Sequence, residues 1–522
     1  MKSSRHVLIL SLAVFGLAAC SLILDSKPGA GDGDADVQGE ADTEEGSDGE
    51  GEEDVFHEDG YDADADGADM SDAQEVEDEE TEPPVTYWAR TYGGTFDDEA
   101  HAVTVLPDGS FVMAGTTNSF HSSMGSWKEM WIVKLDAAGD IVWQKVLGGD
   151  GDDVAYSVIP AGDGGVAAAG YTESYGPAGA NGIIVKLDAA GEIAWKIILG
   201  GDYDDRFFSI AGAGSGGFVA AGASDSFTTG IAVWVVEVDA EGFKEREGCF
   251  IQPSGSGDLK AGAIQSFTDG SFALTGTFKA GGSDQESVLV MKIGSTGACA
   301  WATSIDPSTI LDDRGMGILA MPDGTSVVAA RDLAAGTAHS RAWLVEMSDA
   351  GSVSKNLVLE SAGDDVPFGL VQAPDSGFVL FGMTDSPHPG NYDAMMLKAD
   401  WDSGPAWGRT YGGEEDDGAD GSLPVVPHAF SRVPTGGYVA AGSTGSFGAG
   451  ARDAWVLRVD DSGGPGGGCS DVVQDFAQDM APDPYYAGSG LTVTSSVAVS
   501  TLYVGSLESG DPAASVNEQC PE

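Results

Sequence analysis

The stretch Tyr92-Gly93-Gly94-Thr95-Phe96-Asp97-Asp98 introduces a pattern that returns through the middle of the chain, a glycine-rich turn followed by two aspartates. Measured from Asp97, and including a reduced copy at Gly257-Asp258, successive copies lie 55, 52, 54, 54, 52 and 52 residues apart. A nearly constant period of this length predicts a repeat architecture, here of seven units. The complete pairs are Asp97 and Asp98, Asp152 and Asp153, Asp204 and Asp205, Asp312 and Asp313, Asp364 and Asp365, and Asp416 and Asp417.

Each unit contains four segments with the character of short β-strands. In the first unit they span 99–106, 111–115, 131–136 and 141–146, with turns such as Pro107-Asp108-Gly109 between them. This order is typical of a meander of antiparallel hairpins. Apolar residues on both faces suit sheets that are packed on each side by a neighbour. We therefore expect an all-β fold, a seven-bladed β-propeller of four-stranded antiparallel blades over residues 87–461.

The two ends of the repeat region indicate how the ring closes. Residues 87–91 read as a fourth strand without the first three, and the repeats end after a third strand at 455–460. The N-terminal strand is therefore predicted to complete the last blade. A linear solenoid would instead need polar capping units at both ends, and the sequence shows none.

Residues 1–19 read as a lipoprotein signal peptide. Two basic residues precede an apolar run at 7–19, which is shorter than the roughly 20 residues needed to span a bilayer. The run ends in Leu17-Ala18-Ala19-Cys20, which resembles a bacterial lipobox and implies cleavage before a lipidated Cys20. Because no aspartate follows the cysteine, the common inner-membrane retention signal is missing. We expect lipid anchoring in the outer membrane, on its periplasmic side or at the cell surface.

The chain carries 24 basic and 84 acidic residues, a net charge of −60. This balance argues against nucleic-acid binding and favours cations or basic surfaces as partners. Between Asp25 and Glu82 there are 26 acidic residues and one lysine, so 20–86 should be a disordered acidic linker. Residues 62–67 resemble the opening of a calcium loop, but its twelfth position is Ala73, which favours loose association of cations over a dedicated site.

Four cysteines remain beside Cys20, and in an oxidising compartment they could form two disulfides with three possible connectivities. We favour Cys469–Cys520, which would tie a small tail at 462–522 behind a glycine-rich linker, and Cys249–Cys299, near the ends of successive units. Within the tail, 491–504 alternates valine with serine or threonine, which predicts a pair of exposed strands.

In a propeller, the turns from fourth to first strand and the loops from second to third strand share one face. The aspartate pairs should therefore surround the channel mouth, where they are candidates for binding a metal such as calcium; no other cofactor is indicated. A structural role is favoured, because the pairs recur in nearly every blade and aspartates bond backbone amides at turns. Features of single blades are better binding candidates. These are Trp127, and Leu423 and Pro424 in an eight-residue insertion around 418–427.

The repeat motifs Gly-Gly-x-x-x-Asp, Asp-Gly-x-x-x-x-x-Gly-x-Thr and Lys-Leu-Asp-x-x-Gly resemble SBBP-type bacterial β-propeller repeats over residues 87–461. Such repeats are common in secreted and surface proteins of delta-proteobacterial type. The resemblance implies the propeller fold and no particular activity.

No sequence motif of a zinc protease, serine hydrolase, P-loop ATPase or sialidase occurs. We expect a monomeric, lipid-anchored, non-catalytic binding or assembly module that recognises an envelope protein or an extracellular ligand. The alternatives are a propeller enzyme, either a carbohydrate hydrolase or quinoprotein-like, and a metal-dependent adhesion module.

Overall fold

The computed structural model describes residues 86–465 apart from 121–126, 215, 229, 252–256, 306–311, 334–338, 387 and 419–428, and seven short strands between 473 and 518. The signal peptide, Cys20 and the acidic linker up to residue 85 lie outside the described residues. Within the described part of the chain, no helical segment has the length and apolar character needed to cross a bilayer.

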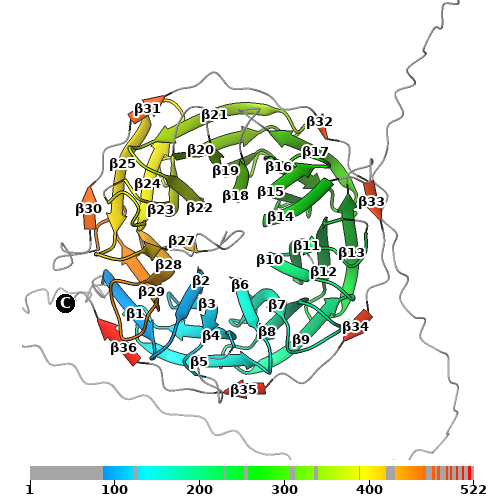
Figure 1. The fold of residues 1–522 in the computed structure, drawn as a ribbon, viewed down its shortest axis with the longest axis horizontal. Helices are drawn as coiled ribbons and strands as arrows, with labels where there is room; N and C mark the ends of the chain where they lie inside the picture. The colour runs from blue at the N-terminus through cyan, green and yellow to red at the C-terminus, as the bar shows by residue number, and fades with distance from the viewer. Residues whose placement is uncertain are drawn as a thin grey trace, which may run out of the picture. The chain divides into compact units, whose positions relative to one another are not determined.

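Seven four-stranded antiparallel blades form a ring, which confirms the predicted propeller (Figure 1). Blades one to three consist of β2 (Asp98–Val105), β3 (Phe111–Thr117), β4 (Glu129–Leu135) and β5 (Ile141–Gly148); β6 (Asp153–Pro160), β7 (Val166–Thr172), β8 (Asn181–Leu187) and β9 (Ile193–Gly200); and β10 (Asp205–Gly212), β11 (Phe218–Ser224), β12 (Ala232–Val238) and β13 (Lys244–Ile251).

Blades four to six repeat this order. They consist of β14 (Gly257–Ser266), β15 (Phe272–Ala280), β16 (Glu286–Ile293) and β17 (Cys299–Ile305); β18 (Arg314–Ala320), β19 (Ser326–Leu333), β20 (Ser340–Met347) and β21 (Val353–Glu360); and β22 (Asp365–Gln372), β23 (Phe378–Thr384), β24 (Asp393–Asp400) and β25 (Gly404–Tyr411).

Blade seven is assembled from both ends of the repeat region. Its first strand is interrupted and appears as β26 (Asp417–Gly418) and β27 (Phe430–Arg432), followed by β28 (Tyr438–Thr444) and β29 (Asp453–Val459). The fourth strand is β1 (Trp88–Gly93), which pairs antiparallel with β29 and sets Trp88 opposite Arg458 and Tyr92 opposite Ala454. The predicted closure by the N-terminal strand is therefore confirmed.

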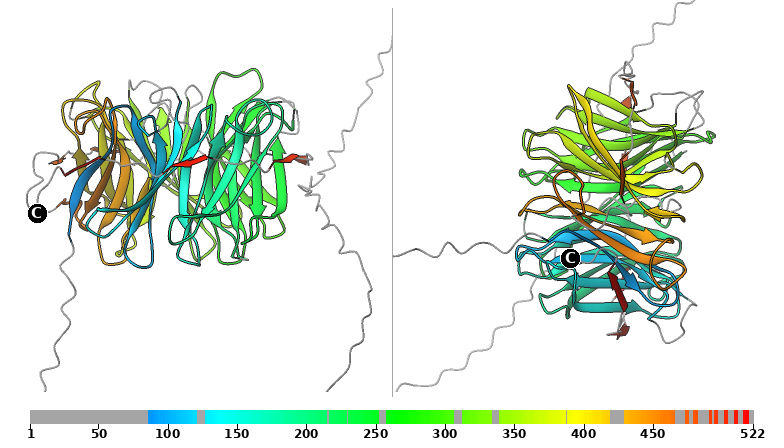
Figure 2. Two further views of the ribbon diagram at one scale, coloured as in Figure 1. Left: turned by 90° about the horizontal axis from the view of Figure 1, so that it is seen from below. Right: turned by 90° about the vertical axis from the view of Figure 1, so that its left-hand side faces the viewer.

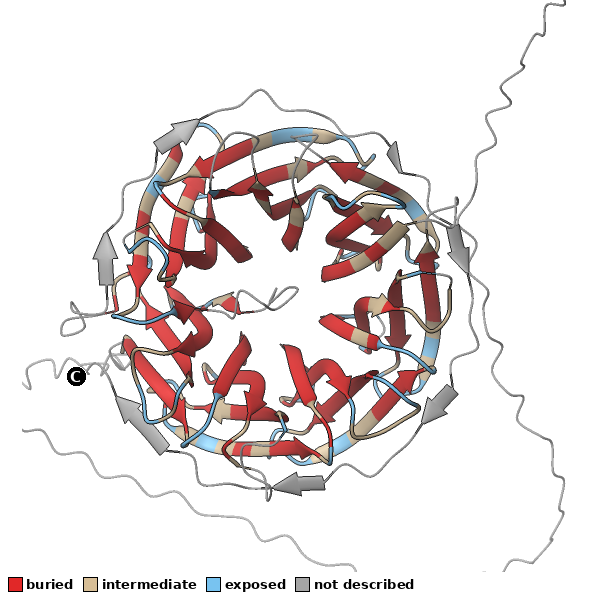
Figure 3. Cartoon of the chain, viewed as in Figure 1, coloured by how far each residue is buried: buried red, intermediate tan, exposed pale blue. Residues whose placement is uncertain are grey.

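Every blade junction in the described ring contains its own cluster of buried apolar side chains. Figure 3 shows buried positions along the strands of all blades, as expected for sheets covered on both faces. Four blades have a tryptophan in the third strand, and each is at most 1 % exposed. They anchor four of the clusters, and truncating a buried tryptophan to alanine typically costs about 3–5 kcal/mol. They are Trp131, Trp234, Trp343 and Trp455.

Tryptophans of the fourth strands join neighbouring blades on the face opposite the aspartate pairs. The indole Nε1 of Trp143 donates to the carbonyl oxygen of Ala189, in the third-to-fourth turn of blade two, at 3.3 Å. A Cβ on Gly191 in that turn would lie 2.7 Å from the Trp143 ring, and its φ is +81°. The Lys-Leu-Asp-x-x-Gly motif therefore supplies a turn whose glycine lies against a neighbouring tryptophan. The same indole-to-turn bond is made by Trp88, Trp195 and Trp301.

A glycine near the end of the second strand lets the first strand approach closely. A Cβ on Gly170 would lie 1.8 Å from the carbonyl oxygen of Val154. The approach results from a β-bulge, because the register between β6 and β7 shifts between Ala155 and Ser157. Bulges bend a strand and leave one residue unpaired. Equivalent glycines meet the same steric limit at Gly115, Gly222, Gly276 and Gly382.

Gly170→Ala should lower the free energy of unfolding by about 3 kcal/mol, because a clash with backbone cannot be relieved by a rotamer change. Gly162→Ala is the matched control in the same blade, since a Cβ there meets no atom within 4 Å. Denaturant titration of the two variants measures the difference. Equal midpoints would show that the bulge relaxes at little cost.

The C-terminal tail does not form the separate appendage or strand pair that its sequence suggested. Its strands lie along the rim of the ring, each pairing antiparallel with the outer strand of a different blade (Figures 1 and 2). They run from blade six back to blade one and end on blade seven. In order they are β30 (Val473–Asp475) on β25, β31 (Asp479–Ala481) on β21, β32 (Gly490–Leu491) on β17, β33 (Thr494–Ser496) on β13, β34 (Thr501–Tyr503) on β9, β35 (Glu508–Gly510) on β5 and β36 (Ser515–Glu518) on β1.

Candidate functional site

The aspartate pairs lie where the turns from fourth to first strand meet the loops from second to third strand. The backbone N–H of Asn118 donates to the carbonyl oxygen of Asp97 at 2.9 Å, and that of Asp98 donates to Arg452 of the preceding blade at 2.9 Å. The predicted gathering of these loops on one face is therefore observed, and we call this the aspartate face.

The first aspartate of a pair joins its blade to the preceding one. Asp152 Oδ1 accepts a hydrogen bond from the backbone N–H of Lys128 at 2.9 Å, at the start of the third strand of blade one. Asp258, in the reduced copy, accepts the equivalent bond from Ile231 at 3.2 Å. Both carboxylates therefore satisfy amides at a blade junction. The same bond is made by Asp204, Asp312, Asp364 and Asp416.

The second aspartate is buried and holds the turn that precedes it. Asp98 Oδ2 accepts bonds from the backbone N–H of Gly94 and the hydroxyl of Ser119, each at 2.7 Å. The Gly-Gly-x-x-x-Asp motif therefore supplies both the amide and the acceptor of one turn. Blade four lacks this bond, because Leu259 stands where the others have aspartate. Equivalent turn bonds are made by Asp153, Asp205, Asp365 and Asp417, and Asp313 accepts from the N–H of Leu333.

Burial dominates the titration of these carboxyls. Loss of hydration raises the pKa of Asp98, Asp153 and Asp365 to about 6 each, although hydroxyl and amide donors oppose the shift. The nearby charge of Asp453 raises the pKa of Asp98 further. The folded ring therefore takes up protons at a pH where an unfolded chain has already released them.

The ring should consequently become more stable as the pH falls from about 7 to about 4.5, by on the order of 1–3 kcal/mol for each of these groups. The sign follows from the raised pKa, since the proton binds more tightly to the folded state. At still lower pH the trend should reverse because of Glu99. This carboxyl is buried, yet its interactions with His101 and Lys128 lower its pKa to about 2. Protonation of Glu99 removes these interactions and so destabilises the folded ring. Thermal unfolding across this pH range is the measurement.

A variant pair separates this effect from the general loss of negative charge. Asp153→Asn removes a buried carboxyl, and Asp202→Asn removes the same charge from an exposed loop position. Asp153→Asn should flatten the pH dependence near pH 6, the pKa of this group, whereas Asp202→Asn should leave it unchanged. An equally steep profile in both would assign the acid stabilisation to overall charge.

The described aspartates do not converge on a metal site. No group of three or more histidine, cysteine, aspartate or glutamate side chains suited to a metal occurs in the described ring. Their hydrogen bonds favour the structural role.

Other sequence candidates have mixed outcomes. Trp127 is 42 % exposed on the aspartate face, and its role as a contact residue stays a prediction. Leu423 and Pro424 lie outside the described residues, as do Cys469 and Cys520. The predicted Cys249–Cys299 disulfide is wrong, because no bond joins them. Cys249 packs in the cluster between blades two and three, whereas Cys299 packs against the cluster between blades three and four, so blade three separates them.

Sequence reasoning missed a row of large side chains at the inner edge of the ring. In five blades the bulge between the first and second strands leaves a residue with a large side chain unpaired. His101 and Tyr156 stack at 5.5 Å between ring centroids, and Tyr156 and Phe208 lie 5.4 Å apart. Met316 and Phe368 occupy the same position in blades five and six and are buried. We call these residues the inner row.

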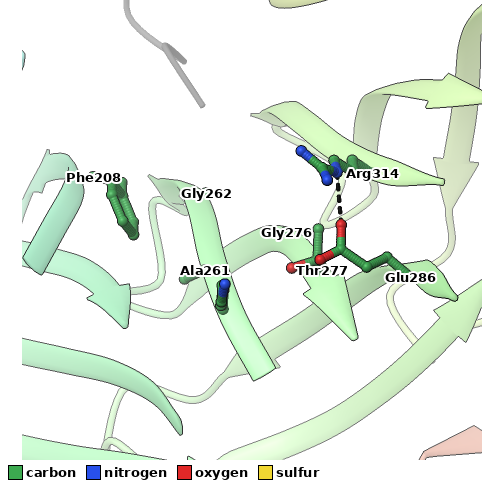
Figure 4. A pocket seen from close by; sticks show the side chains of 8 residues that line it. Phe208, Ala261, Gly262, Gly276, Thr277, Glu286 and Arg314 are labelled. Atoms are coloured by element: carbon green, nitrogen blue, oxygen red, sulfur yellow. Dashed lines mark ion pairs between the residues drawn. The ribbon is translucent and has the colours of Figure 1, made fainter. Parts of the chain in front are cut away.

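Blade four interrupts the inner row, because its bulged residue is Gly262. A pocket of about 90 Å³ opens there at the inner edges of blades three, four and five (Figure 4). It is lined by Phe208, Lys260, Gly262, Thr277, Glu286 and Arg314, among others. Arg314 Nε lies 2.6 Å from Glu286 Oε2 across its rim.

Two basic side chains of this pocket belong to a set of three. Arg206, Lys260 and Arg314 follow the second-aspartate position of blades three, four and five at intervals of 54 residues. Arg206 lies 3.3 Å from Asp204 and stacks over Tyr171 at 4.5 Å. Lys260 makes no ion pair with any of the described residues. The even interval was the signal in the sequence that could have revealed this set.

The strand order of the sheets defines a seven-bladed β-propeller. Its N-terminal strand closes the ring, and the strands of its C-terminal tail pair with the outer edges of the blades. No protein-family model matches the chain, and no curated protein matches it. Two solved structures are similar to it. Sqt1 from Chaetomium thermophilum has 13 % identity and a TM-score of 0.36, covering 72 % of this chain and 99 % of its own. The α-L-arabinofuranosidase Arb93A from Fusarium graminearum has 9 % identity and a TM-score of 0.35, covering 72 % and 98 %.

Proposed function

We propose that this protein is a lipid-anchored binding or assembly module of the bacterial cell envelope, built from SBBP-type repeats and carried on an acidic tether. It acts as a monomer at the outer membrane and presents the aspartate face to an envelope protein or an extracellular ligand. The lipobox at 17–20, the acidic composition of 25–82 and the repeat motifs support this proposal.

One observation carries the binding role. The carboxylates that recur around the aspartate face are engaged in junctions and turns, as Asp152 and Asp98 illustrate. Binding of a partner is therefore assigned to the residues that differ between blades, because they do not serve these junctions and turns. Exposed Trp127 and the pocket at Gly262 are such groups among the described residues.

Anchoring is tested by membrane fractionation of cells that produce the full chain or its Cys20→Ser variant, with metabolic labelling by a fatty-acid analogue. The native chain should carry label and sediment with outer membrane, whereas the variant should be unlabelled. An unlabelled native chain would refute the lipid anchor.

Binding is tested by cross-linking in envelope preparations, with mass spectrometry of the cross-linked partners. Trp127→Ala or deletion of 418–427 should remove particular partners, whereas Phe243→Ala, at an exposed position in a turn on the opposite face, should not. A partner set that is identical in all variants would refute recognition by the aspartate face.

A further inference from the structure

We propose that the pocket at Gly262 binds an acidic sugar, a ring bearing one carboxylate and several hydroxyl groups; this inference rests on the proposed binding function. The pocket exists because one blade departs from the inner row. In blades one, two, three, five and six the bulged residue has a large side chain, whereas in blade four, among these six blades with a continuous first strand, it is glycine. A gap made by a single missing side chain has the scale of one small ligand group.

Charge at the pocket selects an anion. Lys260 and Arg314 contribute two positive charges to the lining, and Glu286 contributes one negative charge that Arg314 already pairs. Lys260 is half-buried and forms no ion pair among the described residues, so an incoming carboxylate would supply its counter-charge. The acidity of the remaining chain does not prevent this, since charges farther away than the Debye length of about 8 Å are largely screened.

The remaining lining suits a sugar ring better than a bare anion. Phe208 presents an aromatic side chain on one side of the gap, against which the C–H face of a sugar can pack (Figure 4). The hydroxyl of Thr277 can donate or accept, and the Glu286 carboxylate can accept from sugar hydroxyls. Charged, hydroxyl and aromatic groups therefore converge on the gap from blades three, four and five.

Three lining residues of the pocket come from the first strand of their blades, so the site is rigid. Phe208, Lys260 and Arg314 lie on the innermost strands β10, β14 and β18. Sites built on strands hold their groups more accurately than sites on loops, so little ordering of the protein is needed when ligand enters.

The experiment is isothermal titration of the full chain with galacturonate and its short oligomers, with galactose and inorganic phosphate as comparison probes. Galacturonate should bind, and galactose and phosphate should bind at least tenfold more weakly. Lys260→Gln should weaken galacturonate binding roughly tenfold or more, as expected for loss of one charge-assisted bond. Lys145→Gln, which removes a lysine paired with Glu192 on an outer strand, should leave it unchanged.

Gly262→Phe provides a second, charge-neutral test, because it restores the inner row and fills the gap. It should abolish galacturonate binding while thermal unfolding shows a folded ring. No heat with galacturonate, equal binding of galactose or phosphate, or undiminished binding to Lys260→Gln and Gly262→Phe would each overturn the proposal. If the cross-linked envelope partners persist while galacturonate fails to bind, the binding-module proposal stands and only the acidic-sugar site fails.

Discussion

A chain from which residues 88–93 have been deleted will not unfold cooperatively, because β29 then has no outer neighbour and blade seven cannot close the ring. The lost strand is almost wholly buried, with Trp88 2 % exposed and Ala89 and Tyr92 fully covered. It also ties blade seven to blade one, since the Tyr92 hydroxyl donates to the carbonyl oxygen of Gly139 at 2.7 Å. The expected result is a species with β-structure, a broad thermal transition and a strong tendency to aggregate.

A single substitution tests the same closure with less disturbance. Thr91→Pro removes a backbone donor in the middle of β1, where Thr91 lies opposite Trp455 of β29 and Asn517 of β36. Proline inside a paired strand removes a ladder hydrogen bond, and leaving the buried partner unsatisfied should cost about 1–3 kcal/mol. Thr86→Pro, just before the strand, is the matched control. If Thr91→Pro melts with the wild-type midpoint, the N-terminal strand does not carry the closure.

The repeat could be predicted from the sequence because each unit makes the same interactions and therefore has the same residues at the same positions. The aspartate pairs, the second-strand glycine and the turn glycine each recur at a fixed place, and the structure shows an interaction at each. Asp98 holds a turn, Gly170 admits a carbonyl oxygen, and Gly191 lies against Trp143. Closure followed from the surplus fourth strand at the start and the missing one at the end.

The pocket could not be predicted in the same way, because it depends on which residue a bulge leaves unpaired. Nothing in the sequence distinguishes Gly262 from the other glycines of the repeats. The register between β14 and β15 shows that it occupies the position where other blades have a large side chain. The disulfide expected between Cys249 and Cys299 was wrong for a related reason. Their spacing resembles one repeat, yet Cys249 lies late in β13 and Cys299 is the first residue of β17.

The pairing of the tail strands with the blades could not be predicted from the sequence, because backbone pairing needs no particular side chains. Strands of two to four residues are too short to show an alternation of apolar and polar residues. The exposed outer edge of each blade is nevertheless a physical reason for such a tail. Unpaired edge strands readily pair with other chains, and proteins cover or interrupt them.

A chain that ends at Pro465 should therefore fold but expose the outer edges of all seven blades. We expect a lower melting temperature, concentration-dependent association in light scattering, and faster amide exchange in β5, β9 and β13, which pair with tail strands in the intact protein. The matched control deletes residues 26–84, a segment of similar length from the acidic linker, and should leave melting and exchange of the ring unchanged.

Adding the separate tail peptide 466–522 to the shortened chain extends this test. Because the tail pairs through backbone hydrogen bonds along one edge after another, the peptide should restore protection on several blades together. Covalent attachment raises the effective concentration of the tail at the outer strands. The attached tail should therefore slow amide exchange far more than an equal concentration of free peptide. A shortened chain that stays monodisperse, melts like the intact protein and exchanges its outer-strand amides at the same rate would show that the tail contributes nothing to the ring.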